Sequence, residues 1–215
     1  MVQRLERLDE GSFSLFVYGQ RVGREQFSMQ RVTAADGVAL ELRAESAEGD
    51  QRAAVTLETD SAGTPVRYAV EERTGALVTR RLGGQRVRGR FATLARSTTG
   101  EAAREFLLVP DAIVLEDRGV LQYALVVRHR TVAVGDSVRI PVLTPIANRQ
   151  GTVWLVREAT NDTVSIAGSR RPATRSRLVT QSGEIRLIWS DADGRLLRVV
   201  IPSRGFEALR DDIPR

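Results

Sequence analysis

The residues that could act as catalytic groups or metal ligands are few in this sequence. It contains no cysteine, no lysine and a single histidine, His129. A thiol nucleophile, a Schiff-base or phosphate-loop lysine, and metal sites built from thiolates or several histidines are therefore excluded. His129 could act as the base of a serine triad, but no Gly-x-Ser-x-Gly elbow supplies the nucleophile. We therefore predict a protein that is not an enzyme and that holds neither a metal nor another cofactor.

Paired carboxylates are the remaining route to acid–base chemistry. Such chemistry needs two carboxyl groups with separated pKa values in one cleft. The spacing of the acidic residues identifies no such pair, so a carboxylate-based hydrolase is the least favoured of the functions considered. The candidate acidic residues are Asp111, Glu116, Asp117, Asp136, Glu158, Asp191 and Asp193.

Arginine is the only strongly basic residue type in the chain, and it could bind anions. The 32 arginines are spread among 27 acidic residues, which gives a formal net charge of +5. Nucleic-acid-binding proteins more often gather their basic residues in a stripe, so we expect no nucleic-acid partner. Arg86, Arg88 and Arg90 alternate, and on a strand they would share one face that binds carboxylate or phosphate groups. The favoured alternative is a solvated face with cross-strand Arg–Glu pairs. The same two interpretations apply to a second group, Arg170, Arg171, Arg175 and Arg177.

Alternating apolar and polar residues dominate the elements that must position these side chains. This period of two is typical of strands that bury one face. Short segments rich in Gly, Asn and Asp separate the alternating runs and favour tight hairpin turns. The pattern predicts a mainly β protein, an antiparallel meander of more than about ten strands curled into a β-roll or partly open barrel. The predicted inward-facing core residues are Phe13, Leu15, Leu40, Leu42, Val55, Leu57, Ile140, Leu187 and Trp189.

The chain is predicted to form one domain over residues 1–215. Its length suits one large all-β domain or two small ones, and Arg96–Gly100 is the stretch at which it would divide. No apolar run approaches the roughly 20 residues of a membrane-spanning helix, so no transmembrane segment is expected. The first residues lack the apolar core of a signal peptide, which fits either a cytoplasmic protein or the mature form of an exported one.

The segment Asp117–Arg130 (DRGVLQYALVVRHR) is compatible with two structures. As a strand, it places Leu121, Tyr123, Leu125 and Val127 on one face. As a helix, it has Asp117 as an N-cap and basic residues at the negative C-terminal end of the helix dipole. In the helix, the buried stripe would consist of Val120, Leu121, Ala124 and Val127.

Several features together resemble the bacterial proteins grouped as domain of unknown function 3108 and its relatives. They are a glycine-framed turn at residues 19–25, the segment Asp117–Arg130, Gly135-Asp136 at the start of a strand pair, and a closing hairpin from Glu184 to Ile201 followed by Pro202. Proteins of that group adopt a spiral β-roll and mostly belong to the cell envelope. The resemblance implies one central helix at about 117–130 and a location in the periplasm or cell envelope. It carries over no catalytic residues.

These observations lead us to expect a non-enzymatic envelope β-roll that binds a lipid or another apolar ligand. The ligand would lie between the helix and the curved sheet, unless the helix only seals the core. Tyr123 and Leu125 are expected near the rim of this site, and Arg128 would be the nearest cation for an acidic head group. The main alternative is a structural module that binds a protein partner through its sheet surface.

Overall fold

A computed structural model describes residues 4–34, 37–117, 119–129 and 133–214. The described chain forms one 15-stranded sheet whose strand order is β8-β7-β6-β5-β4-β3-β2-β1-β15-β14-β13-β12-β11-β10-β9. Neighbouring strands are antiparallel except for the parallel pair β9 and β10. The order begins at β8 and ends at β9, so the sheet is open. The prediction of a mainly β, antiparallel meander is confirmed.

The first and last strands pair in the middle of this order and divide the sheet into two halves. The N-terminal half consists of β1 (Arg4–Val17), β2 (Gln20–Ala34), β3 (Gly37–Glu48), β4 (Gln51–Asp60), β5 (Pro65–Thr74), β6 (Leu77–Val87), β7 (Arg90–Ser97) and β8 (Gly100–Leu107). The C-terminal half consists of β9 (Ile113–Val114), β10 (Ser137–Thr144), β11 (Arg149–Ile166), β12 (Ser169–Thr180), β13 (Ile185–Ser190), β14 (Leu196–Ile201) and β15 (Phe206–Arg210), with a short 3-10 helix η1 (Pro202–Arg204) before β15.

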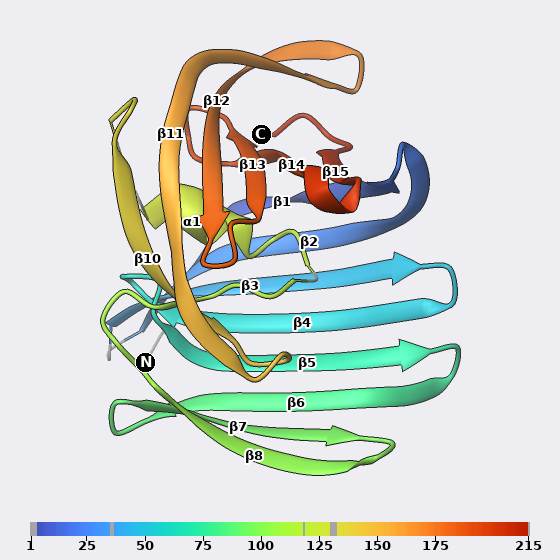
Figure 1. Cartoon of the computed structure of the whole chain (residues 1–215), viewed down its shortest axis with the longest axis vertical. Coiled ribbons are helices and arrows are strands. Elements are labelled where there is room, and N and C mark those ends of the chain that lie inside the picture. The colour runs from blue at the N-terminus through green and yellow to red at the C-terminus, as the bar shows by residue number, and fades with distance from the viewer. Residues whose placement is uncertain (1–3, 35–36, 118, 130–132, 215) are drawn as a thin grey trace.

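Curvature brings the two halves face to face. Figure 1 shows β3–β8 side by side, with β10–β13 crossing their direction and the helix α1 (Tyr123–His129) between the two sets of strands. The sheet thus wraps around a segment of its own chain. The described residues contain no helix with the length and apolar character required to traverse a bilayer.

The predicted division of the chain at Arg96–Gly100 falls on a hairpin. β7 ends at Ser97 and β8 begins at Gly100, and these two residues are paired across the turn. The sheet therefore continues through this stretch without interruption.

A buried arginine fixes the junction between β1 and β15. The Arg210 side chain is fully buried and pairs with both carboxylate oxygens of Asp9 at 2.8 and 2.9 Å, while Asp212 lies at 3.0 Å. Its guanidinium also lies over the Phe27 ring at 5.1 Å. A buried charge is tolerated only when it is paired and hydrogen-bonded, so this cluster specifies how the two halves join.

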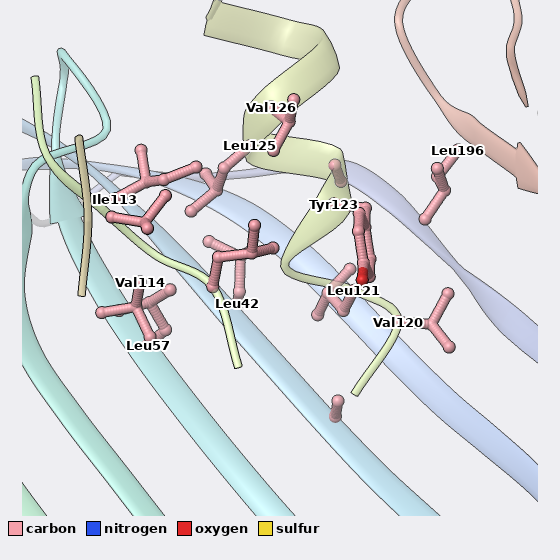
Figure 2. Close-up of a cluster of buried hydrophobic side chains, with 14 of the residues drawn as sticks. Leu42, Leu57, Ile113, Val114, Val120, Leu121, Tyr123, Leu125, Val126 and Leu196 are labelled. Carbon is pink, nitrogen blue, oxygen red and sulfur yellow. The ribbon is translucent and has the colours of Figure 1, made fainter. Parts of the chain in front are cut away.

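The main core lies between the halves and surrounds α1. Leu42 and Leu57 from the sheet face Ile113, Val114 and Leu121 (Figure 2). Side chains of α1 are buried on several sides, which differs from the single apolar stripe of a surface helix. The described part of α1 acts as a plug inside the curled sheet. Its fully buried residues are Tyr123, Ala124, Leu125 and Val126.

The helix is shorter than the predicted segment at about 117–130. α1 spans seven residues, Tyr123–His129, and residues 130–132 lie outside the described part of the chain. Gly119 has φ +99°, a left-handed conformation that interrupts a helix. Asp117 does not cap the helix, because its carboxylate pairs with Arg186 at 2.7 Å.

Most predicted core residues are buried, but the face assigned to β13 is wrong. Phe13, Leu15, Leu40, Leu42, Leu57 and Ile140 lie in the main core. In β13, Arg186 and Ile188 face the main core, whereas Leu187 and Trp189 belong to a second cluster. The hairpin of β11 and β12 supplies Val164, Ile166 and Ala173 to this cluster and so covers what would otherwise be an outer face. Both faces of β13 therefore contain apolar residues, and alternation alone cannot choose between them.

We predict that Arg210→Leu lowers the free energy of unfolding by about 3–5 kcal/mol, because it leaves Asp9 buried without its partner. Equilibrium denaturation in urea measures the change. The control is Arg7→Leu, which breaks the exposed Arg7–Glu10 pair and should cost less than about 1 kcal/mol. Equal losses for the two variants would contradict the assigned importance of the buried cluster.

Candidate functional site

A cavity of about 470 Å³ lies between the concave face of the N-terminal half and the segment that leads into α1. Strands β3 to β5 supply one wall through Ala44, Ala53, Val55 and Val70. The opposite wall, the roof segment, is residues 119–122 followed by Tyr123. Of these, Gly119, Val120 and Tyr123 line the cavity. The C-terminal half closes the remaining side with Ile146, Ile201 and Phe206.

Val55 belongs to this wall and also packs against the edge of the main core. It is half-buried, although its alternation with Leu57 predicts a fully buried position. The inward direction is correct, and part of the Val55 side chain borders the cavity. The cavity therefore lies next to the edge of the main core.

Charged side chains surround the apolar walls. Arg80 pairs with Glu72 at 3.4 Å, Arg73 pairs with Glu71 at 2.6 Å, and Arg204 pairs with Asp117 at 3.3 Å. Arg52 differs from these three lining arginines, because it donates only to the carbonyl oxygens of Gly49 and Gln51, at 2.7 and 2.9 Å. In the described part of the chain, Arg52 has no carboxylate partner and can interact with an anionic group at the mouth.

Glu25 is the ionisable side chain buried in the cavity wall. It lies on β2, is 1% exposed, and occupies an inward position in the alternating run that continues with Phe27 and Met29. Its carboxylate accepts the backbone N–H of Val120 at 2.9 Å and that of Leu121 at 2.8 Å. Burial raises the pKa of Glu25 to about 7, although these two hydrogen bonds lower it.

Glu116 is a second buried carboxyl group, on the other side of the roof segment. Its side chain accepts the backbone N–H of Ile146 at 2.8 Å, and its own N–H donates to the Gln122 Oε1 atom at 2.5 Å. The pKa of Glu116 is raised to about 8, mainly by burial and also by the charges of Asp117 and Glu72, while the hydrogen bond from Ile146 acts in the opposite direction. Glu116 does not line the cavity, so Glu25 and Glu116 do not form a carboxylate pair that faces a common ligand.

A network of charged residues holds the start of the roof segment to the C-terminal half. Arg186, whose side chain is 5% exposed, donates to Asp117 at 2.7 Å and to the Tyr123 hydroxyl at 2.8 Å. Glu184 accepts hydrogen bonds from both Arg186 and Arg204. Because all polar partners are satisfied, the network positions Tyr123 at the cavity wall with little freedom.

The residues proposed from sequence for an apolar-ligand site occupy different places. Tyr123 lines the cavity, but as a buried wall residue. Leu125 is completely buried in the main core, and it does not line the cavity. The side chains of Arg128 and His129 lie outside the described part of the structure. Glu25 and Arg52 were missed, although an acidic residue at an inward strand position is a signal that could have identified Glu25.

The three alternating arginines do not form one face. β6 ends at Val87, and Arg88 and Gly89 form a hairpin turn with φ +48° and +77°. Val87 pairs with Arg90 on β7, so Arg86 and Arg90 point to opposite faces. Arg86 pairs with Asp60 at 2.7 Å, and Arg90 lies 3.7 Å from Glu105. The prediction of a shared face is wrong because an Arg-Gly turn interrupts the strand.

Two of the four residues in the second arginine group form cross-strand pairs with an acidic residue. Arg175 and Arg177 on β12 both donate to Glu158 on β11, at 3.1 and 2.7 Å. Arg170 and Arg171 lie at the start of β12 and are exposed. In the described residues, no group of three or more His, Cys, Asp or Glu side chains is placed to hold a metal ion.

Comparison with known proteins supports the fold. No protein-family model matches the chain, and no curated protein matches it. It is similar to a crystal structure described as a beta-barrel-like protein of domain of unknown function DUF1849 from Brucella abortus, with a TM-score of 0.58. The similarity covers 99% of this chain and 98% of that chain at 9% sequence identity, so it concerns the fold alone. The chain therefore has a β-rich fold shared with a protein of unknown function, and this likeness is not to the 3108 group specifically.

We predict that stability falls as the pH rises from about 5 to about 8, because the folded state keeps protons on Glu25 and Glu116 that the unfolded state has lost. Below about pH 4 the stability should fall again as the pH decreases further. Burial alone would raise the pKa values of Asp117 and Glu184, but contacts with Arg186 and Arg204 hold them below their usual range.

Thermal unfolding followed across this pH range measures the effect. Between about pH 5 and about pH 8, Glu25→Gln and Glu116→Gln should each lose a few kcal/mol less stability than the unmodified protein loses, because glutamine does not titrate. A stability curve that rises through this range in the unmodified protein would contradict the assignment.

Proposed function

We propose that this protein is a non-enzymatic binding protein of the cell envelope that holds a lipid-like or other apolar ligand in the cavity described above. The observation that carries the proposal is the cavity itself. Its volume, about 470 Å³, lies in the range of small-molecule sites, and its lining is divided about equally between apolar residues and polar or charged residues.

The shape and chemistry of the walls favour an amphiphile. Ala44, Ala53 and Val55 offer a smooth apolar surface on which an alkyl chain can pack. The charged residues lie around this surface, and Arg52 has no carboxylate partner in the described structure. An acidic or phosphate-containing head group placed near Arg52 would form a charge-assisted contact. Arg52 thus takes the place that sequence reasoning gave to Arg128.

The envelope location rests on the resemblance to the domain of unknown function 3108 group. That group mostly occurs in the envelope and adopts a spiral β-roll, and an open curled sheet around a helix is consistent with such a roll. Fold likeness is a weak guide to function, so the ligand is argued from the cavity and not from the likeness.

A role as a protein-interaction module has one observation in its favour. Trp154 on β11 and Ile185 on β13 are 38% and 39% exposed, and both pair with Val179 on β12, which lies between them. They form a small apolar patch on the outer face of the C-terminal half, which a partner could cover. Glutamate substitution of Trp154 would abolish such binding and leave the cavity unchanged.

The cavity proposal is tested by filling the site with a large side chain. Ala53→Trp places an indole in the cavity, and it should reduce binding of lauroyl lysophosphatidylcholine by about tenfold or more through overlap with the ligand. Isothermal titration calorimetry below the critical micelle concentration measures the affinity. Native mass spectrometry of the unmodified protein shows whether an apolar molecule co-purifies.

The matched control is Ala54→Trp. Ala54 is the next residue on β4, is exposed, and points to the opposite face. This variant should bind as the unmodified protein does. Equal binding by all three proteins would rule out the cavity as the ligand site.

A further inference from the structure

Glu25 lies where the cavity meets a second, smaller void. This void has a volume of about 10 Å³, close to the smallest that can hold one water molecule, and is lined by Leu42, Leu57 and Leu121. Glu25 and Gly119 line both spaces. The roof segment, residues 119–122, therefore lies over a region of the sheet that is not fully packed beneath it.

Glu25 also ties the roof segment to the sheet. One carboxylate oxygen accepts N–H groups from Val120 and Leu121 at 2.9 and 2.8 Å, and the other lies 3.0 Å from the Val120 nitrogen. These bonds link β2 to a segment about 95 residues later in the chain. Release of the Glu25 contacts would let residues 119–122 rise from Leu42 and Leu57.

Building on the proposed function, we propose that Glu25 is a proton-sensitive latch on the cavity. Its carboxylate holds the roof segment closed, and its protonation lets an apolar chain extend from the cavity towards Leu42 and Leu57.

Two physical effects act in the same direction. Hydrogen bonds to an ionised carboxylate are about twice as strong as those to a neutral group, so protonation loosens the roof. When the roof segment moves away, an alkyl chain that enters beneath it takes the place of the Val120 and Leu121 N–H groups beside Glu25, and this apolar surrounding disfavours the charged form. Ligand binding and proton uptake are therefore linked, and each strengthens the other. Because burial raises the pKa of Glu25 to about 7, this exchange falls near neutral pH.

Other titratable and charged groups line the same cavity, and the charge of Glu48 contributes to the raised pKa of Glu25. The acidic residues on the same cavity are Glu48 from β3, Glu72 from β5 and Asp117 before the roof segment. The arginines on the cavity, which keep their charge, come from β4, β5, β6 and η1 and are Arg52, Arg73, Arg80 and Arg204. Burial raises the pKa values of Tyr68 and Tyr123, so both stay neutral.

The cross-strand neighbours of Glu25 are Phe13 on β1 and Ser46 on β3, and neither titrates near neutral pH. Glu116 is a second buried carboxyl group with a raised pKa, but its carboxyl accepts the Ile146 N–H, not an N–H of the roof segment, and it does not line the cavity. It therefore provides the matched control.

The test uses lauroyl lysophosphatidylcholine, whose head group does not titrate in the range used, with affinity measured by calorimetry at about pH 5.5 and about pH 8.5. The unmodified protein should bind about tenfold or more tightly at the lower pH. Glu25→Gln should bind equally at both pH values, with about the affinity that the unmodified protein shows at the lower pH. Glu116→Gln should keep the pH dependence of the unmodified protein.

The outcomes separate the latch from the proposed function. Binding with the same pH dependence in the unmodified protein and in Glu25→Gln overturns the latch and leaves the cavity as a binding site. No binding by the unmodified protein at either pH overturns both. If Glu25→Gln does not fold, a second measurement tests the latch. Binding of the same ligand to Glu116→Gln is measured by calorimetry near pH 7 in two buffers of different ionisation enthalpy, which gives the number of protons taken up per ligand. Uptake of up to about one proton per ligand supports the latch, and no uptake overturns it.

Discussion

The pairing of the first strand with the last is the constraint on which the other features of this fold depend. It places β1 and β15 at the centre of the strand order, so that the N-terminal and C-terminal halves of the sheet curl towards each other from a common seam. Arg210 is buried at this seam with Asp9 and Asp212, and a charge in that position is stable only with those partners. A shifted register would separate the charges, so the ion cluster selects one alignment of the halves.

The seam also explains why the protein has a plug and a cavity. Two curved halves that face each other leave more space than their own side chains fill, and α1 with the residues before it occupies part of that space. A cavity of about 470 Å³ remains next to the plug, bordered by apolar strand residues and by charged side chains. The proposed amphiphilic ligand would occupy this cavity, with its chain on the apolar wall and its head group among the charged residues. Under that proposal, the buried carboxyl of Glu25, which is costly to keep there, would be part of the binding site.

Much of the fold follows from patterns within single strands. Alternation identified Phe13, Leu15, Leu40, Leu42 and Ile140 as inward-facing, because in these strands only one face is apolar. For Trp189 it predicted burial correctly but not the face, since the β11–β12 hairpin covers the outer face of β13 and Trp189 joins a second cluster there. It also failed at Arg88, where a left-handed turn replaces a strand position. For the candidate site, the sequence predicted a ligand between helix and sheet, with Tyr123 and Leu125 near the rim and Arg128 as the nearest cation. The structure places a cavity there, with Tyr123 buried in its wall, Leu125 in the main core and Arg52 among the lining residues.

The sequence by itself determined the class of the molecule. The absence of cysteine and lysine and the single histidine exclude chemistry that depends on a thiol, a lysine amine or several histidines, and the repeated alternation predicts antiparallel sheet, because both conclusions depend only on residue type and local spacing. Only the tertiary structure decided that Glu25 meets the N–H groups of Val120 and Leu121, and that Val55 borders the cavity. These contacts join residues far apart in the chain. Their geometry depends on how far the whole sheet curls, which no local pattern encodes.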